Sequence, residues 1–379
     1  MSRLATRVIH EGYKPEPLAG CVSPPIYLST TYAQESVGEH KGFEYARSNN
    51  PNREILEKNI SALENAVGSC AFSTGMAAIS TLVLSLEKGS HIIVSSNVYG
   101  GTYRVFTKVF QNHGLEFSFV STKDLEALQG SLRPNTRLIF VETPTNPLME
   151  ITDIQAIADF AHENGIRLCV DNTFMTPIFQ RPLELGADFV IHSATKYLGG
   201  HSDVLGGLIC LKNKEDYETL KFLQKSVGNV LAPFDSWLIL RGIRTLDVRM
   251  QAHERNANKV VNFLDGHCGV EKIYYPGVEN HPNREVGLRQ SSGYGGMISF
   301  ELKNPDRLDQ FLKRLEIFTL AESLGAVESL VCIPALMTHA SVPAEERVKL
   351  GIKDTLIRLS IGIEDPKDLI EDLDKALKE

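Results

Sequence analysis

The sequence lacks the patterns that mark membrane-spanning, zinc-binding and disulfide-stabilised proteins. No apolar run approaches the ~18 residues that indicate a transmembrane helix. The six cysteines are scattered, without a Cys-x-x-Cys pair or the spacing of a zinc finger. We therefore expect free thiols in a reducing, cytoplasmic compartment, two of them (Cys169 and Cys210) buried inside apolar segments.

Other absences narrow the function further. The histidines are not clustered, so no metal site is predicted. The turn at 73–78 lacks the Gly-x-Gly-x-x-Gly pattern of a dinucleotide-dependent dehydrogenase. The first 20 residues carry charges and no apolar segment, so we expect no signal peptide. A net charge of −8 and a pI near 5.8 argue against nucleic acid or an anionic membrane as the main partner.

The sequence does have enough apolar material for a large core, with 42% hydrophobic and 23% charged residues. Over residues 46–242, short apolar segments alternate with helical patterns, which predicts an α/β domain with a mostly parallel sheet covered on both faces. Over residues 243–379, longer helical stretches and separate strands predict a smaller α+β domain. Residues 1–45 are rich in turn formers, and we expect an extended arm without its own core.

Periodicity and turn residues place the individual elements. Helices are predicted at 76–86, 102–112, 154–161, 248–264 and 306–315. A last helix is expected to begin with Asp365 as N-cap and Pro366 at its first position. Strands are predicted at 70–72, 91–94, 116–120, 138–141, 168–170, 189–191, 208–211, 270–275, 297–302 and 356–361.

A lysine follows one of these strands among hydroxyl residues and glycines, in the stretch from His192 to Asp203. Free lysine titrates near ~10.4, but a lysine held neutral forms a Schiff base with aldehydes such as pyridoxal phosphate. Lys196 is the candidate, with Ser193 and Thr195 beside it as possible phosphate ligands. A second strand ends at Asp171, a residue type that pairs with the pyridinium nitrogen of this cofactor. Because ligands bind beyond the carboxyl ends of parallel strands, we expect these residues to lie at one site.

Two more turns follow predicted strands. The first, Ser73 to Ala77, leads into a helix at Gly75, and N–H groups at a helix start bind phosphate well. The second contains Tyr99, whose ring is suited to stack on an aromatic cofactor. Each turn alone is a weak signal, because glycine turns and half-buried loop tyrosines are usually structural.

Taken together, the motifs resemble the transsulfuration (Cys/Met metabolism) family of pyridoxal-phosphate enzymes. The resemblance covers nearly all of the chain in one order and spacing. It rests on the segments Phe43 to Arg53, Ser73 to Ala77, Val98 to Thr102, Glu142 to Pro147, Val170 to Phe174, Ser193 to Tyr197, Ala321 to Gly325, Met337 to Ala340 and Ile357 to Ser360.

The resemblance implies fold type I, as in aspartate aminotransferase, and a role for each site residue. Lys196 would hold pyridoxal phosphate covalently and move protons between substrate carbons, while Asp171 would pair with the ring nitrogen. Tyr99 would stack on the ring and help to protonate the leaving sulfur. The remaining cofactor ligands would be Gly75, Met76, Thr173, Ser193 and Thr195, with Tyr45 and Arg47 from a neighbouring subunit. The substrate ligands would be Arg358, Ser323, Asn146, Glu322 and Glu44.

The resemblance also implies a homotetramer in which active sites are shared across a dimer. The substrate would be a small sulfur amino acid. Glu44 and Glu322 lie where the family binds the far end of the substrate, and two carboxylates there suit the distal ammonium group of cystathionine.

We expect γ-lyase cleavage of L-cystathionine to cysteine, 2-oxobutanoate and ammonia, with hydrogen sulfide release as a side activity. The main alternative is a cystathionine γ-synthase, which the two carboxylates do not distinguish from a γ-lyase. Gly101 and Leu324 stand where methionine γ-lyases carry a cysteine and β-lyases a tryptophan, so these two activities are less favoured. A Schiff-base aldolase would not need both phosphate and pyridinium partners, and a non-catalytic relative would have lost one of the set.

Overall fold

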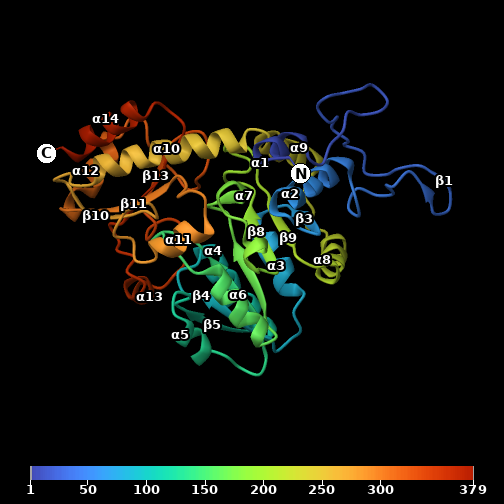
Figure 1. Ribbon diagram of the computed structural model, residues 1–379, viewed down its shortest axis with the longest axis horizontal. Helices are drawn as coiled ribbons and strands as arrows, with labels where there is room; N and C mark the ends of the chain where they lie inside the picture. The colour runs from blue at the N-terminus through green and yellow to red at the C-terminus, as the bar shows by residue number, and fades with distance from the viewer. Residues whose placement is uncertain (1, 379) are drawn as a thin grey trace.

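A seven-stranded sheet lies at the centre of the computed structural model, which describes residues 2–378 (Figure 1). Strands β4 to β8 pair in parallel, and β9 runs antiparallel to both of its neighbours. The prediction of a mostly parallel sheet is confirmed, and each predicted strand of this region is present. In sheet order the strands are β3 (Gly68–Phe72), β9 (Gly207–Leu211), β8 (Phe189–Ser193), β7 (Arg167–Asp171), β6 (Thr136–Glu142), β4 (His91–Ser95) and β5 (Glu116–Val120).

Helices cover both faces of this sheet because its strands are apolar on both sides. Ile92 of β4 packs into one buried cluster with α3 (Gly75–Leu84), α4 (Gly100–Lys108) and α8 (Lys214–Val227). The next residue, Ile93, points to the opposite cluster, which contains α2 (Pro51–Glu64), α6 (Ile154–Glu163) and α9 (Pro233–Ile243). Cys169 and Cys210 are both buried in the sheet, as predicted.

A second sheet of five strands lies toward the C-terminus. Its order is β10 (Val270–Tyr274), β11 (Met297–Leu302), β14 (Ile357–Ser360), β13 (Leu330–Cys332) and β12 (Thr319–Leu320). It packs against α10 (Leu246–Leu264), α12 (Leu308–Arg314) and α14 (Pro366–Leu377). The start of α14 is confirmed, since the side chain of Asp365 accepts a hydrogen bond from the Lys367 N–H. The long helix α10 runs beside both parts of the molecule and contacts α9 and α14 (Figure 1).

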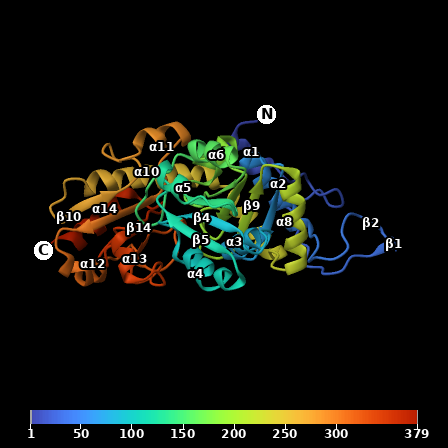
Figure 2. The same cartoon turned by 90° about the horizontal axis from the view of Figure 1, so that it is seen from below.

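Residues 2–45, which lie within the predicted arm of residues 1–45, include one helix that the sequence did not predict. Helix α1 (Leu4–His10) packs on α2 and buries Val8, so this segment shares the main core. Beyond it, the chain has little regular structure apart from the hairpin of β1 (Gln34–Ser36) and β2 (Glu39–His40), whose residues are exposed. Figure 2 shows this hairpin projecting beyond α8 at the end opposite the C-terminal sheet.

Several short elements complete the chain. The helix predicted at 102–112 is divided at Val109 into α4 and the 3-10 turn η1 (Phe110–His113). No helix within residues 2–378 has the length and apolar character needed to cross a bilayer. The remaining short helices and 3-10 turns of the described residues are α5 (Leu125–Gly130), α7 (Thr176–Phe179), η2 (Pro182–Leu185), α11 (Arg284–Gln290), η3 (Pro305–Arg307) and α13 (Ala344–Lys349).

Candidate active site

Lys196 lies just beyond the carboxyl end of β8, in a turn largely shielded from solvent. Its Nζ donates a hydrogen bond of 2.9 Å to the Ser323 hydroxyl, which comes from the C-terminal part of the chain. Burial, and secondarily the positive charge of Arg358, lowers the pKa of Lys196 from 10.5 to about 8. A substantial fraction of this amine is therefore neutral near physiological pH and can react with a carbonyl.

A small cradle is present at the start of α3. A Cβ on Gly75 would lie 3.1 Å from the Cβ and 3.2 Å from the Oγ of Ser193, so only glycine leaves this space open. Within residues 2–378, the N–H groups of Gly75 and Met76 have no acceptor, whereas the next one donates to the Thr74 side chain. Free N–H groups at a helix start and a facing hydroxyl are suited to a phosphate. The hydroxyl of Thr195, in contrast, exchanges hydrogen bonds with the backbone of Gly206.

Asp171 ends β7 and is held by Thr173. Its Oδ1 accepts hydrogen bonds from the backbone N–H (3.0 Å) and the hydroxyl (2.6 Å) of Thr173. The same hydroxyl accepts from the Ser193 N–H at 2.8 Å, which ties the ends of β7 and β8 together. Burial raises the pKa of Asp171. Its Oδ2 makes no hydrogen bond within the described chain, so a cationic N–H placed there would offset the cost of burying the carboxylate.

Arg358 on β14 lies buried beside Lys196. Its Nη1 donates to Asn146 Oδ1 at 3.0 Å and its Nη2 to the Ser323 carbonyl at 2.9 Å. Its Nε is buried and has no hydrogen-bond partner in the part of the chain described. A guanidinium with a free donor is suited to bind a carboxylate. Ser323 has a φ of +95°, an uncommon backbone conformation for a residue with a side chain.

Tyr99 immediately precedes α4, and its side chain is exposed. Its N–H donates to Glu142 Oε2 at 2.9 Å. A Cβ on Gly101 would come within 2.4 Å of the Tyr99 ring, so the ring position requires glycine there. Glu142 was not predicted as a site residue, although it is the first residue of the motif Glu142 to Pro147. Its buried position at the carboxyl end of β6 identifies it as part of the site.

Tyr45 and Arg47, predicted to come from a neighbouring subunit, and Glu44, predicted to bind the far end of the substrate, are not joined to these groups within the described chain. Glu44, Tyr45 and Arg47 are exposed, and none forms a hydrogen bond or ion pair with Lys196, Asp171 or Gly75 across residues 2–378. Glu322 is also exposed, and its charge acts on Lys196 by raising the pKa of that amine. The family resemblance places Tyr45 and Arg47 at the site of a neighbouring subunit, and within the single chain only Glu322 of these four residues acts on Lys196.

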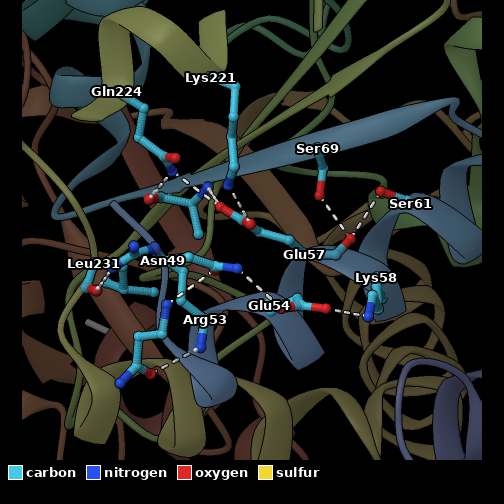
Figure 3. A network of polar contacts seen from close by, with 12 residues as sticks. Asn49, Arg53, Glu54, Glu57, Lys58, Ser61, Ser69, Lys221, Gln224 and Leu231 are labelled. Carbon is cyan, nitrogen blue, oxygen red and sulfur yellow. Dashed lines mark hydrogen bonds and ion pairs between the residues drawn. The ribbon is translucent and has the colours of Figure 1, made fainter. Parts of the chain in front are cut away.

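Arg53, which Figure 3 shows in the polar network of α2, holds the segment that carries Tyr45 and Arg47. This buried guanidinium donates from Nη2 to the carbonyls of Ala46 (2.8 Å) and Arg47 (3.2 Å) and from Nη1 to that of Leu231 (3.4 Å). Glu57, one turn further along α2, accepts hydrogen bonds from Lys221, Gln224 and the backbone of β3. The arm is therefore attached to α2 through the buried Arg53 side chain, whereas Glu57 joins α2 to α8 and β3.

A hollow of about 1130 Å³ lies elsewhere on the described chain. It is lined by β10, the segment around His281 and the loop after β6. It contains none of the residues predicted for the site, and none of its lining groups forms a comparable constellation of lysine, aspartate and arginine. The chemistry of the molecule therefore points to the edge of the seven-stranded sheet rather than to this groove.

Known proteins match the chain over nearly its whole length. The family described as Cys/Met metabolism PLP-dependent enzyme matches residues 5–378. Cystathionine gamma-lyase of Bacillus subtilis is 52% identical over 373 residues, which are 98% of either chain. Cystathionine beta-lyase of Lactococcus lactis subsp. cremoris is 48% identical over 378 residues, which are 100% of either chain. The crystal structure of cystathionine gamma-lyase from Lactobacillus plantarum complexed with L-serine superposes with a TM-score of 0.96 at 46% identity, covering 99% of this chain and 98% of that one.

The observed residues fit pyridoxal phosphate, the cofactor of this family. The cradle at Gly75 leaves room and free donors for a phosphate, Asp171 presents an unbonded oxygen, and Lys196 supplies an amine with a pKa of about 8. The central sheet, mostly parallel and covered on both faces, is consistent with fold type I. The protein therefore belongs to the Cys/Met metabolism family of pyridoxal-phosphate-dependent enzymes.

Proposed function

We propose that this protein is a carbon–sulfur lyase of the cystathionine γ-lyase type. It cleaves L-cystathionine, with water, to cysteine, 2-oxobutanoate and ammonia, and it releases hydrogen sulfide from cysteine as a side activity. The observation that carries the proposal is the linkage of Lys196 to Arg358 through Ser323. A reactive amine and a carboxylate-binding guanidinium are thereby held around one small space.

The proposed roles follow from this arrangement. When bound, pyridoxal phosphate supplies the electron sink that stabilises negative charge next to the substrate amino group. Arg358 binds the substrate carboxylate, with Asn146 and Ser323 orienting the guanidinium. Lys196, as the neutral amine, accepts the proton from Cα and transfers protons between carbons. Tyr99 protonates the departing sulfur, which leaves as cysteine.

The cofactor ligands proposed within the chain are Gly75 and Met76 at the helix start, the hydroxyl residues Ser193, Thr195 and Thr173, and Asp171. Tyr45 and Arg47 are proposed to complete the phosphate site of a neighbouring subunit. Their exposure on a segment held by Arg53 supports this placement. An assembly of this kind is at least a dimer, and we propose a cytoplasmic homotetramer built from two such dimers.

The organisation proposed for the chain has three parts: an N-terminal arm at 1–45, a cofactor-binding domain at 46–242 and a C-terminal domain at 243–379. Glu322 from the last part and Glu44 from the partner's arm would bind the distal ammonium group of cystathionine. The exposure of both carboxylates supports this role, because a distal substrate group lies toward the mouth of a site.

Two related activities compete with this proposal. A γ-synthase would join cysteine to an O-acylhomoserine, and the same carboxylates would bind its product. A β-lyase would release pyruvate and homocysteine, and the similarity to the Lactococcus lactis protein favours including it in the test. The presence of Leu324, which is buried beside the Lys196 turn, is the local feature against it.

A product assay on the cofactor-loaded protein tests the proposal. L-cystathionine is supplied alone, and then an O-acylhomoserine is supplied with cysteine, while 2-oxobutanoate, pyruvate and cystathionine are quantified. Dominant 2-oxobutanoate from cystathionine supports the γ-lyase. Net cystathionine synthesis with little keto acid would show a γ-synthase, and dominant pyruvate would refute γ-cleavage.

A further inference from the structure

Glu142 is a buried carboxylate in the middle of the candidate site, with 6% of its surface exposed. It ends β6 directly opposite Asp171, the last residue of the neighbouring strand β7. Both of its oxygens are used: Oε2 accepts from the Tyr99 N–H at 2.9 Å and Oε1 from the Asn146 N–H at 3.0 Å. Its side chain therefore joins the turn before α4 to the loop after β6.

These two bonds continue into a chain of contacts that reaches Lys196. Asn146 accepts from Arg358 at 3.0 Å, and Arg358 donates to the Ser323 carbonyl at 2.9 Å. The Ser323 hydroxyl in turn accepts from Lys196 at 2.9 Å. Glu142 is the one member of this chain that also contacts Tyr99, so it connects the residue proposed to stack on the cofactor with those proposed to bind the substrate carboxylate.

The electrostatics show that this placement is costly. Burial, and then the charge of Asp171, raises the pKa of Glu142, while the two N–H donors and Arg358 act in the opposite direction. A neutral glutamine would avoid that cost, but its NH2 group cannot accept a hydrogen bond. Two acceptor oxygens on one side chain are therefore the property that this position uses.

We propose that Glu142 is a positioning residue that fixes the position of Tyr99 relative to the Asn146–Arg358 pair across the cofactor site. This inference depends on the proposed placement of pyridoxal phosphate at Lys196. It adds that the orientation of the ring-stacking residue and of the carboxylate-binding residue depend on one shared carboxylate. Changing Glu142 then perturbs both at once, without touching any atom that reacts.

The test compares Glu142→Gln with Glu57→Gln in the holoenzyme. Glu57 is a matched control because it is equally buried and also accepts a backbone N–H, that of Ala71 at 2.9 Å, but it lies in the polar network of α2 (Figure 3). Each variant is measured for kcat/KM and KM with cystathionine, for the visible circular dichroism of bound pyridoxal phosphate, and for thermal unfolding. The dichroism reports the asymmetric surroundings of the cofactor ring and needs no substrate.

Glu142→Gln is expected to lower kcat/KM about tenfold, because one of the two hydrogen bonds accepted at this position is lost and its N–H donor is left unpaired. It should also raise KM and change the dichroism of the cofactor. Glu57→Gln should lower the unfolding temperature while leaving kcat/KM and the dichroism at wild-type values. Wild-type kcat/KM and dichroism in Glu142→Gln would overturn the proposal, as would a Glu57→Gln variant that reproduces both changes.

If Glu142→Gln does not fold with cofactor, Glu142→Asp carries the same test. Aspartate keeps the charge but is one methylene too short to reach both N–H groups, so the same losses are expected and wild-type values would again overturn the inference. Failure of the proposed function is distinguishable, because it would appear in the wild-type protein as absent cystathionine cleavage. The dichroism comparison would still decide the role of Glu142 in that case.

Discussion

The lowered pKa of Lys196 predicts how the apoprotein takes up its cofactor as the pH changes. Only the neutral amine attacks the aldehyde of pyridoxal phosphate. With a pKa of about 8 in place of 10.5, the neutral fraction at pH 7 rises about 300-fold, from about one amine in 3000 to about one in ten. The rate of covalent attachment should therefore rise with pH up to about 8 and then level off.

The assay is stopped-flow mixing of apoprotein with pyridoxal phosphate across pH 6 to 10, followed by the visible absorption of the bound cofactor. Nα-acetyl-lysine in the same buffers is the control, because its amine has an unshifted pKa and reacts with the same cofactor. Dividing the rate for the protein by the rate for acetyl-lysine cancels the titrations of the cofactor and leaves the titration of Lys196. A ratio that shows no break near pH 8 and stays constant to pH 10 would refute the lowered pKa.

Variants of Arg358 separate the two causes of the shift. Burial is the larger cause and the Arg358 charge the second, so Arg358→Met should move the midpoint above 8 without reaching 10.5. Arg358→Lys keeps a positive charge and should leave the midpoint near 8. A midpoint of 10.5 in Arg358→Met would show instead that burial contributes little.

Three further substitutions test the geometry. Gly75→Ala places a Cβ 3.1 Å from the serine that ends β8 and should weaken the binding of pyridoxal phosphate to the apoprotein about tenfold. Gly130→Ala is the control, because its Cβ would meet nothing within 4 Å and the affinity should not change. Equal affinities of the two variants would contradict a phosphate site at the start of α3. Gly101→Ala should displace the Tyr99 ring and change the visible dichroism of the holoenzyme with little loss of stability, and an unchanged spectrum would count against that ring position. Arg53→Met removes the donors that hold the arm and should raise the cofactor dissociation constant of the assembled enzyme, measured by titration; an unchanged constant would separate the arm from the phosphate site.

Local sequence was sufficient for most strands. The limits predicted for 116–120 and 297–302 agree with β5 and β11, because each is an apolar or alternating segment bounded by turn residues. Helix α2 was missed although Asn50 and Pro51 form a recognisable start, with the Asn50 side chain capping the first turn. Its inner face buries Leu56, Ile60 and Leu63 at helical spacing, so both the cap and the apolar periodicity of this helix were present in the sequence.

The candidate site was likewise predictable from local sequence only in part. Lys196 and Asp171 were recognisable because each follows its own strand, and parallel strands present their carboxyl ends at one edge. The contact between Asn146 and Arg358 spans 212 positions, and that between Lys196 and Ser323 spans 127. No periodicity reports such pairs, and only the family resemblance suggested that these residues belong together.

By itself, the sequence predicted most of the strands and singled out Lys196, Asp171 and the turn at Gly75 as candidate cofactor ligands, because each of these features depends on neighbours within a few residues. Only the tertiary structure decided that Glu142 joins Tyr99 to Asn146 and that Arg53 holds the arm. It also set the pKa of Lys196, through burial and the nearby Arg358. Desolvation and long-range hydrogen bonds depend on which distant segments pack together, and that packing is a property of the whole fold.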